Sequence, residues 1–236
     1  MATRVFIPVR GKRLRITKLD SCGRVPAGGA LDSFIVTDGF INVQLSAVVE
    51  DGTEIVQRNI TGALCVNELA SSSFKRFTVT AEFCGVNPAL LTMVSNAEPY
   101  EDHEGNVAGF TIPEGDIEKW FALELWTGLS GAACAEGVDE ASGYLLLPFI
   151  QGGTLGDVTI DGENAVTFSM QGAYTKGGNG WGVGPYEVVY DDATPPVAAQ
   201  LPTALDAFDH LLLMDTGLAV PEADDDPQAM PTPVGG

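Results

Sequence analysis

The chain has 236 residues, a mass of 24.8 kDa and a formal net charge of −20. This length is enough to bury one full core, and the 45% of hydrophobic residues excludes a disordered chain. No apolar run approaches the roughly 18 residues that a membrane span needs, and the first residues contain no apolar signal region. We therefore expect a soluble protein with no membrane partner.

The charge is divided unevenly along the sequence. Residues 1–24 contain seven basic residues against Asp20 alone, a net charge of +6, whereas the other 212 residues carry −26. A basic end joined to an acidic body can pair head to tail with other copies, although the acidity also fits a surface that only needs solubility. Ordinary nucleic-acid binding is disfavoured, because an acidic body repels phosphates.

The turn-forming residues and the cysteines further limit the class of fold. The 28 glycines and 14 prolines recur at short intervals, which predicts many strands and turns and a mainly β fold. The four cysteines are widely spaced and form no C-x-x-C pair, so we expect reduced thiols rather than a zinc site or a disulfide framework.

The first half of the chain contains several predicted strands. Residues 3–9 and 13–19 alternate around a turn at Gly11-Lys12, which predicts a hairpin, and a short strand follows at 34–36. The clearest predicted hairpin joins 41–49 to 54–58, because Asp51-Gly52 supplies the positive φ angles of a tight turn.

An alternating strand at 74–83 precedes the one convincing helix, predicted over 89–95. Asn87 suits its N-cap and Pro88 its first turn.

The second half continues the β pattern. A strong strand is predicted at 117–127, and another at 144–150, where Pro148 favours an edge position. A second hairpin is predicted from 158–160 to 165–171. We expect residues 1–200 to form a β-sandwich or barrel domain with extended loops. Residues 201–236 should then dock on its surface and continue as a flexible, acidic, proline-rich tail.

Four stretches follow one another in a distinctive order. They are FALELWTG (121–128), GDVTI with AVTF (156–160 and 165–168), GWGVGPY (180–186), and LPTAL with DHL (201–205 and 209–211). In this order they resemble the major tail tube proteins of long-tailed, non-contractile phages of actinobacteria. The resemblance spans roughly residues 1–215.

The resemblance implies a structural virion protein that catalyses nothing and holds no cofactor or metal. Such subunits fold as a small β-sandwich with one packed helix and form rings of six, which stack into a tube around a tape measure protein. Tail terminator and distal tail proteins are further implied partners. The tube belongs to the virion, is assembled in the host cytoplasm, and conducts phage DNA without binding it specifically.

Two sets of candidate site residues follow from the charge and the polar strand faces. Contacts between subunits are expected from the basic residues Arg10, Lys12, Arg13 and Arg15. Polar faces of two alternating strands face either the outside solvent or the channel, and they are our candidates for the channel wall: Asn42, Gln44, Ser46, Thr78, Thr80 and Glu82. Arg76 shares the face of Thr78, and we expect it to lie beyond this wall or to pair with Glu54 or Glu124.

Other functions remain open as alternatives. A head-decoration or other coat protein would also be β-rich and acidic. A carbohydrate- or receptor-binding module would use Trp120, Trp126 and Trp181 as a platform. The polar run at 102–104 with His210 lacks the spacing of metal ligands. The glycine-rich run at 177–184 lacks the ending of a phosphate loop and is interpreted as a tight loop packing under Trp181.

Overall fold

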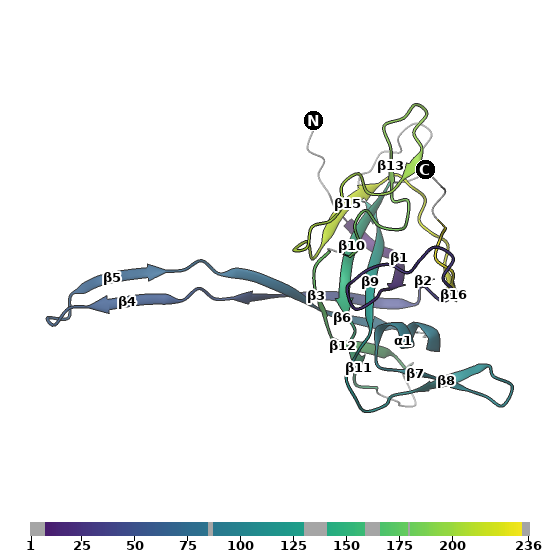
Figure 1. Ribbon diagram of the computed structural model, residues 1–236, viewed down its shortest axis with the longest axis horizontal. Helices are drawn as coiled ribbons and strands as arrows, with labels where there is room; N and C mark the ends of the chain where they lie inside the picture. The colour runs from purple at the N-terminus through teal and green to yellow at the C-terminus, as the bar shows by residue number, and fades with distance from the viewer. Residues whose placement is uncertain (1–7, 85–86, 130–140, 159–165, 179, 233–236) are drawn as a thin grey trace.

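The computed structural model describes residues 8–84, 87–129, 141–158, 166–178 and 180–232 (Figure 1). These residues form strands and one short helix, which confirms the expected mainly β fold with one short α-helix. The main sheet contains β1 (Pro8–Lys18), β2 (Phe34–Thr37), β3 (Phe40–Glu50), β6 (Ser73–Phe83), β9 (Trp120–Leu129), β10 (Ser142–Gln151), β11 (Thr154–Leu155), β12 (Phe168–Thr175), β15 (Leu212–Thr216) and β16 (Asp224–Gln228). Three strand pairs lie outside it: β4 (Glu54–Arg58) with β5 (Leu64–Leu69), β7 (Glu98–Glu101) with β8 (Val107–Thr111), and β13 (Val189–Tyr190) with β14 (Ala198–Ala199).

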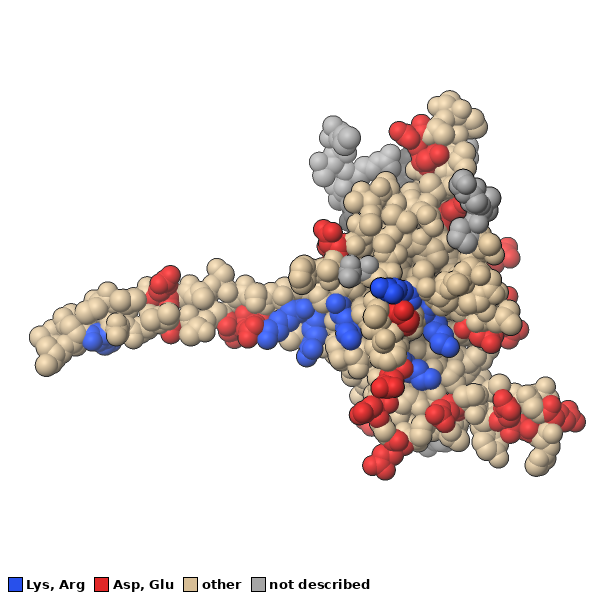
Figure 2. Space-filling model, in the orientation of Figure 1, with Lys and Arg blue, Asp and Glu red and all other residues tan. Residues whose placement is uncertain are grey.

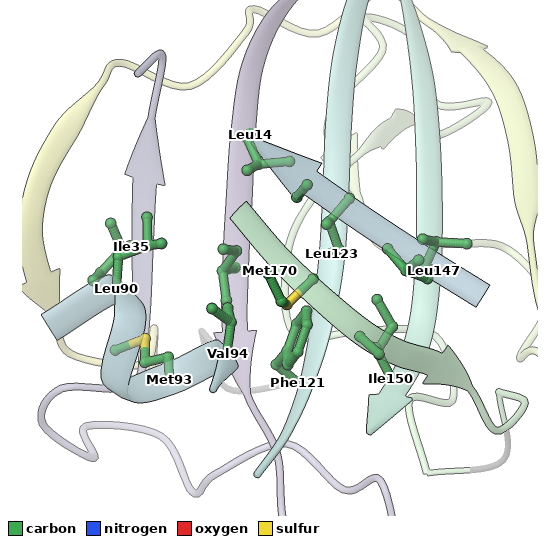
Figure 3. Packing of buried hydrophobic residues seen from close by; sticks show 14 of the residues in the cluster. Leu14, Ile35, Leu90, Met93, Val94, Phe121, Leu123, Leu147, Ile150 and Met170 are labelled. Atoms are coloured by element: carbon green, nitrogen blue, oxygen red, sulfur yellow. The ribbon is translucent and has the colours of Figure 1, made fainter. Parts of the chain in front are cut away.

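The main sheet folds over itself into two layers. Its strand order is β16-β2-β1-β9-β10-β12-β6-β3, and only two residue pairs join β10 to β12. At this narrow join the sheet turns, so that β6 and β12 cross over β1, β9 and β10 (Figure 3). The side chains that fill the space between the layers include Leu14, Val79, Phe83, Phe121, Leu123, Ile150 and Met170. This packing of sheet on sheet buries the alternate apolar residues of each strand.

A second core covers the other face of the layer formed by β1, β9 and β10. It is built from aromatic and aliphatic side chains: Trp126, Tyr144, Phe149, Trp181, Tyr186, Leu201 and Met230. Trp181 is 4% exposed and lies in the glycine-rich run, as expected. A Cβ atom on Gly184 would lie 2.7 Å from the indole nitrogen of Trp181, and Gly184 has φ +82°, so only glycine fits there.

The helix α1 (Pro88–Val94) closes one end of the first core with Leu90, Met93 and Val94 (Figure 3). Its start agrees with the sequence, because the side chain of Asn87 accepts a hydrogen bond from the amide of Ala89 at 2.8 Å. Pro88 occupies the first turn, where a missing amide hydrogen leaves nothing unpaired.

The hairpin predicted around Gly11-Lys12 is wrong. β1 is one strand that pairs with β9, and its register shifts at Gly11 and again before Arg13. A Cβ atom on Gly11 would lie 2.8 Å from the ring of Phe40. The glycine therefore marks a bulge and a close contact within the strand rather than a turn.

The hairpin predicted at Asp51-Gly52 is also wrong. β3 pairs with β6 and β4 pairs with β5, so the chain passes through Gly52 without reversing. The amide of Ala70 donates to the carbonyl of Thr53 at 3.1 Å, and a Cβ atom on Gly52 would lie 1.6 Å from the carbonyl oxygen of Ala70. Gly52 is needed because two backbones approach closely, not because a turn needs a positive φ.

Pro148 does not mark an edge strand. β10 pairs with β9 along most of its length and also with β15 and β12. The pairing with β9 shifts register between Leu147 and Ile150, so a bulge accommodates the residue that lacks an amide hydrogen. The second predicted hairpin lies partly outside the described residues.

Residues 201–236 contribute two strands to the main sheet. β15 pairs with β10, so this part of the segment docks on the body as a strand. β16 pairs with β2 and forms one end of the sheet, where the tail was expected to be flexible. The side chain of Asn87 also donates to the carbonyl of Asp225 at 2.6 Å, which holds this segment near α1.

Candidate assembly interface

The most prominent feature is a two-stranded ribbon that projects from the body, here called the arm (residues 51–72) (Figure 1). β3 and β6 leave the body as paired strands and continue as β4 and β5. The chain reverses at the tip, where the amide of Asn59 donates to the carbonyl of Ala63 at 2.9 Å. At about 3.3 Å per residue, the ten residues from the arm's start to its tip span about 33 Å.

The arm exposes apolar side chains on both of its faces. Every residue of β4 and β5 is exposed. The strand register places Ile55 and Val66 on one face and Val56 and Leu69 on the other, while Ile60 at the tip is fully exposed. A two-stranded hairpin is marginally stable in water when it packs against nothing, and exposed apolar surface of this kind marks a contact with another molecule.

The six candidate wall residues lie together on one face of the β3–β6 pair. They form three cross-strand pairs: Asn42 with Glu82, Gln44 with Thr80, and Ser46 with Thr78. The side chain of Asn42 donates to the carboxylate of Glu82 at 2.5 Å. The alternate residues of β6 point the other way into the first core, so this polar face (the polar wall) is turned away from the core.

The polar wall continues onto β12 and ends at Arg76. Tyr174 lies opposite Thr78, and its hydroxyl donates to the side chain of Gln151 at 2.7 Å. The guanidinium of Arg76 stacks 4.7 Å from the ring centre of Tyr174. The expected pairing of Arg76 with a carboxylate is wrong for Glu124, whose carboxylate binds Arg15, and the structure shows no bond to Glu54 among the described residues.

Arg15 is not a surface residue, and its expected contact with another subunit is wrong. It is 7% exposed, and its guanidinium donates twice to the fully buried carboxylate of Glu124, at 2.6 Å each. The hydroxyl of Tyr144 donates to the same carboxylate at 2.6 Å, and the guanidinium lies 3.3 Å from the ring centre of Tyr186. The charge is therefore satisfied inside one chain.

The buried cluster around Arg15 shifts the protonation of its members. Burial acts to lower the pKa of Arg15, but the adjacent Glu124 carboxylate outweighs it and raises that pKa above the usual value. Burial, aided by the same carboxylate, raises the pKa of Tyr144 well above its usual value. Burial also raises the pKa of Tyr186. The arginine stays charged and both tyrosines stay neutral. Arg15 and Glu124 therefore remain an ion pair with a structural role.

The other three basic candidates lie nearer the surface. Arg10 is exposed and Lys12 is half-buried. Arg13 is half-buried and donates to Asp38 of the same chain at 2.9 Å. Basic side chains gather on the body next to the start of the arm, whereas acidic side chains dominate the opposite, β7–β8 end (Figure 2).

A groove that the sequence did not predict lies between α1, the base of the β7–β8 hairpin and the loop after β1. Its volume is about 640 Å³. Its apolar lining is Leu19, Ala89, Met93, Pro99, Val107, Trp120 and Pro227. These residues come from five separate parts of the chain, so no local sequence pattern indicates the groove.

The residues of the alternative functions occupy other settings. Trp126 and Trp181 are buried in the second core, at 3% and 4% exposed, so they cannot form an exposed sugar-binding platform. His210 bonds the hydroxyl of Thr175 at 2.7 Å, and burial lowers its pKa. The carboxylate of Asp102 accepts amide hydrogens from its own turn. Among the described residues, no group of three or more potential metal ligands occurs.

Comparison with known proteins yields no match, either to a family model or to a curated sequence. Within the described residues no helix is long and apolar enough to cross a membrane.

Proposed function

We propose that this chain is the structural subunit of a phage tail tube, which assembles with copies of itself into stacked rings. The observation that carries the proposal is the arm, about 33 Å long, which projects away from the body and has apolar side chains on both faces. Such a ribbon needs a surface to pack against. A second copy of the chain can provide that surface, and it is present at the same concentration as the first. The ring of six and the tape measure, terminator and distal tail partners rest on the resemblance alone.

The polar wall supports a role in conducting DNA. Its six residues carry one acid, Glu82, and no base, and Arg76 at its margin lies over Tyr174. Each lysine or arginine that contacts a phosphate adds affinity for DNA. A channel lined by hydroxyl, amide and acidic groups therefore lets DNA pass without holding it. The protein acts by shape and surface, without catalysis, and belongs to the virion.

Assembly of the purified protein tests the proposal. Light scattering should show association that grows with concentration, and electron microscopy should show rings or open-ended tubes. A variant with residues 54–69 replaced by a short glycine-containing turn should stay folded, because β4 and β5 pair only with each other, yet it should fail to form tubes. A full-length protein that remains monomeric at high concentration would overturn the proposal, and binding to capsids without tubes would favour a decoration protein.

A further inference from the structure

The arm meets the body at the first residues of β6, here called the arm root (residues 73–77). The pairing of β3 with β6 shifts register between Val48 and Val49, which leaves Lys75 as the extra residue of a bulge. A bulge bends a strand and increases its twist, so the ribbon can change direction here. A two-stranded ribbon alone is only marginally stable. The direction of the arm therefore depends on what holds its root.

An aromatic contact holds one face of the arm root. The ring centre of Phe74 lies 4.8 Å from that of Phe77. It also lies 5.3 Å from the ring centre of His210, and these two rings meet edge to face. His210 belongs to the segment just before β15 and is distant from β6 in the sequence. Edge-to-face packing has a preferred geometry, so His210 limits how far Phe74 can tilt.

A hydrogen-bond chain joins the same histidine to the backbone of the arm root. The amide of Phe77 donates to the hydroxyl oxygen of Thr175 at 2.9 Å. The same hydroxyl bonds Nδ1 of His210 at 2.7 Å. Because the oxygen already accepts from the amide, its own hydrogen is available for the ring nitrogen. His210 is thus linked to the root both through a ring and, by way of Thr175, through a backbone amide.

A second aromatic contact holds the opposite face of the arm root. Tyr174 lies opposite Thr78 in the sheet, and the guanidinium of Arg76 stacks 4.7 Å from its ring centre. Arg76 therefore lies on the face of Thr78. Phe74 lies on the other face, where it packs on Phe77. The root is gripped between two aromatic contacts on opposite faces.

The segment that carries His210 is itself anchored to the body. Leu205, before it, packs against the second core, and Leu211, after it, packs against the first core. Between them the carboxylate of Asp209 accepts the amide hydrogen of Asp206 at 2.7 Å, which closes the loop. The histidine is therefore presented to the arm root by a fixed loop.

We infer that His210 is a positioning residue for assembly, which holds the arm in the direction that brings it to another copy. The arm is about 33 Å long, so a tilt of about 10° at its root moves the tip by about 6 Å. An arm that is already held loses less conformational freedom when it binds. This inference rests on the proposed self-assembly and names the residue that prepares the arm for it.

Time-resolved energy transfer between dyes on Cys65 of the arm and Cys22 of the body measures the direction of the arm within one copy. Both thiols are exposed, and Cys84→Ser with Cys134→Ser leaves them as the only cysteines. At nanomolar concentration, below that of assembly, this chain should give one narrow distribution of dye distances. His210→Ala should widen the distribution and leave the far-ultraviolet circular dichroism spectrum unchanged.

Two further variants show that the effect belongs to the contacts of His210. His210→Asn keeps an acceptor at the position of Nδ1 but removes the ring, so it should give a distribution of intermediate width. Phe208→Ala is the matched control, because it removes an aromatic ring from the same segment. Phe208 is 89% exposed, and its removal should leave the width unchanged.

Assembly gives the second readout. His210→Ala should raise the concentration needed for assembly about 2- to 12-fold, as for one group that must be ordered on binding. A distribution as narrow as that of the unchanged chain would overturn the inference, and so would a wider one with an unchanged assembly concentration. A chain that never assembles would overturn the proposed function and the role in assembly together, and the width would then still show whether His210 holds the arm.

Discussion

Replacing Glu124 by leucine is expected to destabilise the folded chain more than most single substitutions. The change leaves the guanidinium of Arg15 buried at 7% exposure, without the two charged hydrogen bonds that it now makes. It also removes the acceptor of the Tyr144 hydroxyl. The protein would have to bury a charge and a hydroxyl that have lost their partners.

The magnitude follows from the burial of the pair. Removing one partner of a buried ion pair costs about 3–5 kcal/mol, because the remaining charge is left uncompensated. For a chain of this size each kcal/mol lowers the melting temperature by about 2–4 °C. Glu124→Leu should therefore lower it by about 6–20 °C. Tyr144→Phe removes only one donor to the carboxylate and should cost about 1.5–3 kcal/mol.

Thermal unfolding followed by circular dichroism, at a concentration below that of assembly, measures these effects. The decisive control is Arg15→Met combined with Glu124→Leu, which replaces both charges by apolar groups and should recover most of the lost stability. Arg15→Met alone and Glu124→Leu alone should therefore each be less stable than the double variant. A Glu124→Leu variant whose free energy of unfolding lies within 1 kcal/mol of the unchanged protein would show that the buried ion pair does not contribute as described.

Three further outcomes are expected. Gly52→Ala forces a Cβ atom against the carbonyl of Ala70, so it should cost about 1–3 kcal/mol and increase hydrogen exchange in the arm; unchanged exchange would contradict the close approach. Arg10→Gln removes an exposed charge, so it should weaken assembly in low salt and change the melting temperature by no more than about 4 °C, because an exposed pair contributes about 0.2–1 kcal/mol; equal assembly at all salt concentrations would argue against a role for Arg10. Glu82→Lys adds a cation to the polar wall, so assembled tubes should bind DNA with an affinity that falls as salt rises; no gain in binding would argue against a luminal wall.

Local patterns in the sequence predicted those strands and the helix whose formation depends mainly on neighbouring residues. The alternation of residues 74–83 matches β6, where Val79, Ala81 and Phe83 are buried. Asn87 caps the helix as its position suggested. The two polar faces proposed for the wall meet as neighbours because their strands pair in register, although the sequence alone could not show that pairing.

The errors arose where distant contacts decide the structure. Asp51-Gly52 has the composition of a tight turn, but the approach of Ala70 makes the glycine necessary in an extended ribbon. Arg15 lies in a basic stretch and looked like a surface residue. Its partner Glu124 is 109 residues away in the chain, and no local sequence pattern indicates that these two residues pair.

A cryo-electron microscopy reconstruction of the assembled protein would show whether this chain builds a tube. We predict stacked rings around an open channel, with Asn42, Gln44, Thr80 and Glu82 facing that channel and each arm buried against a neighbouring subunit. Particles that remain single copies, or tubes in which the arms extend into solvent, would contradict it.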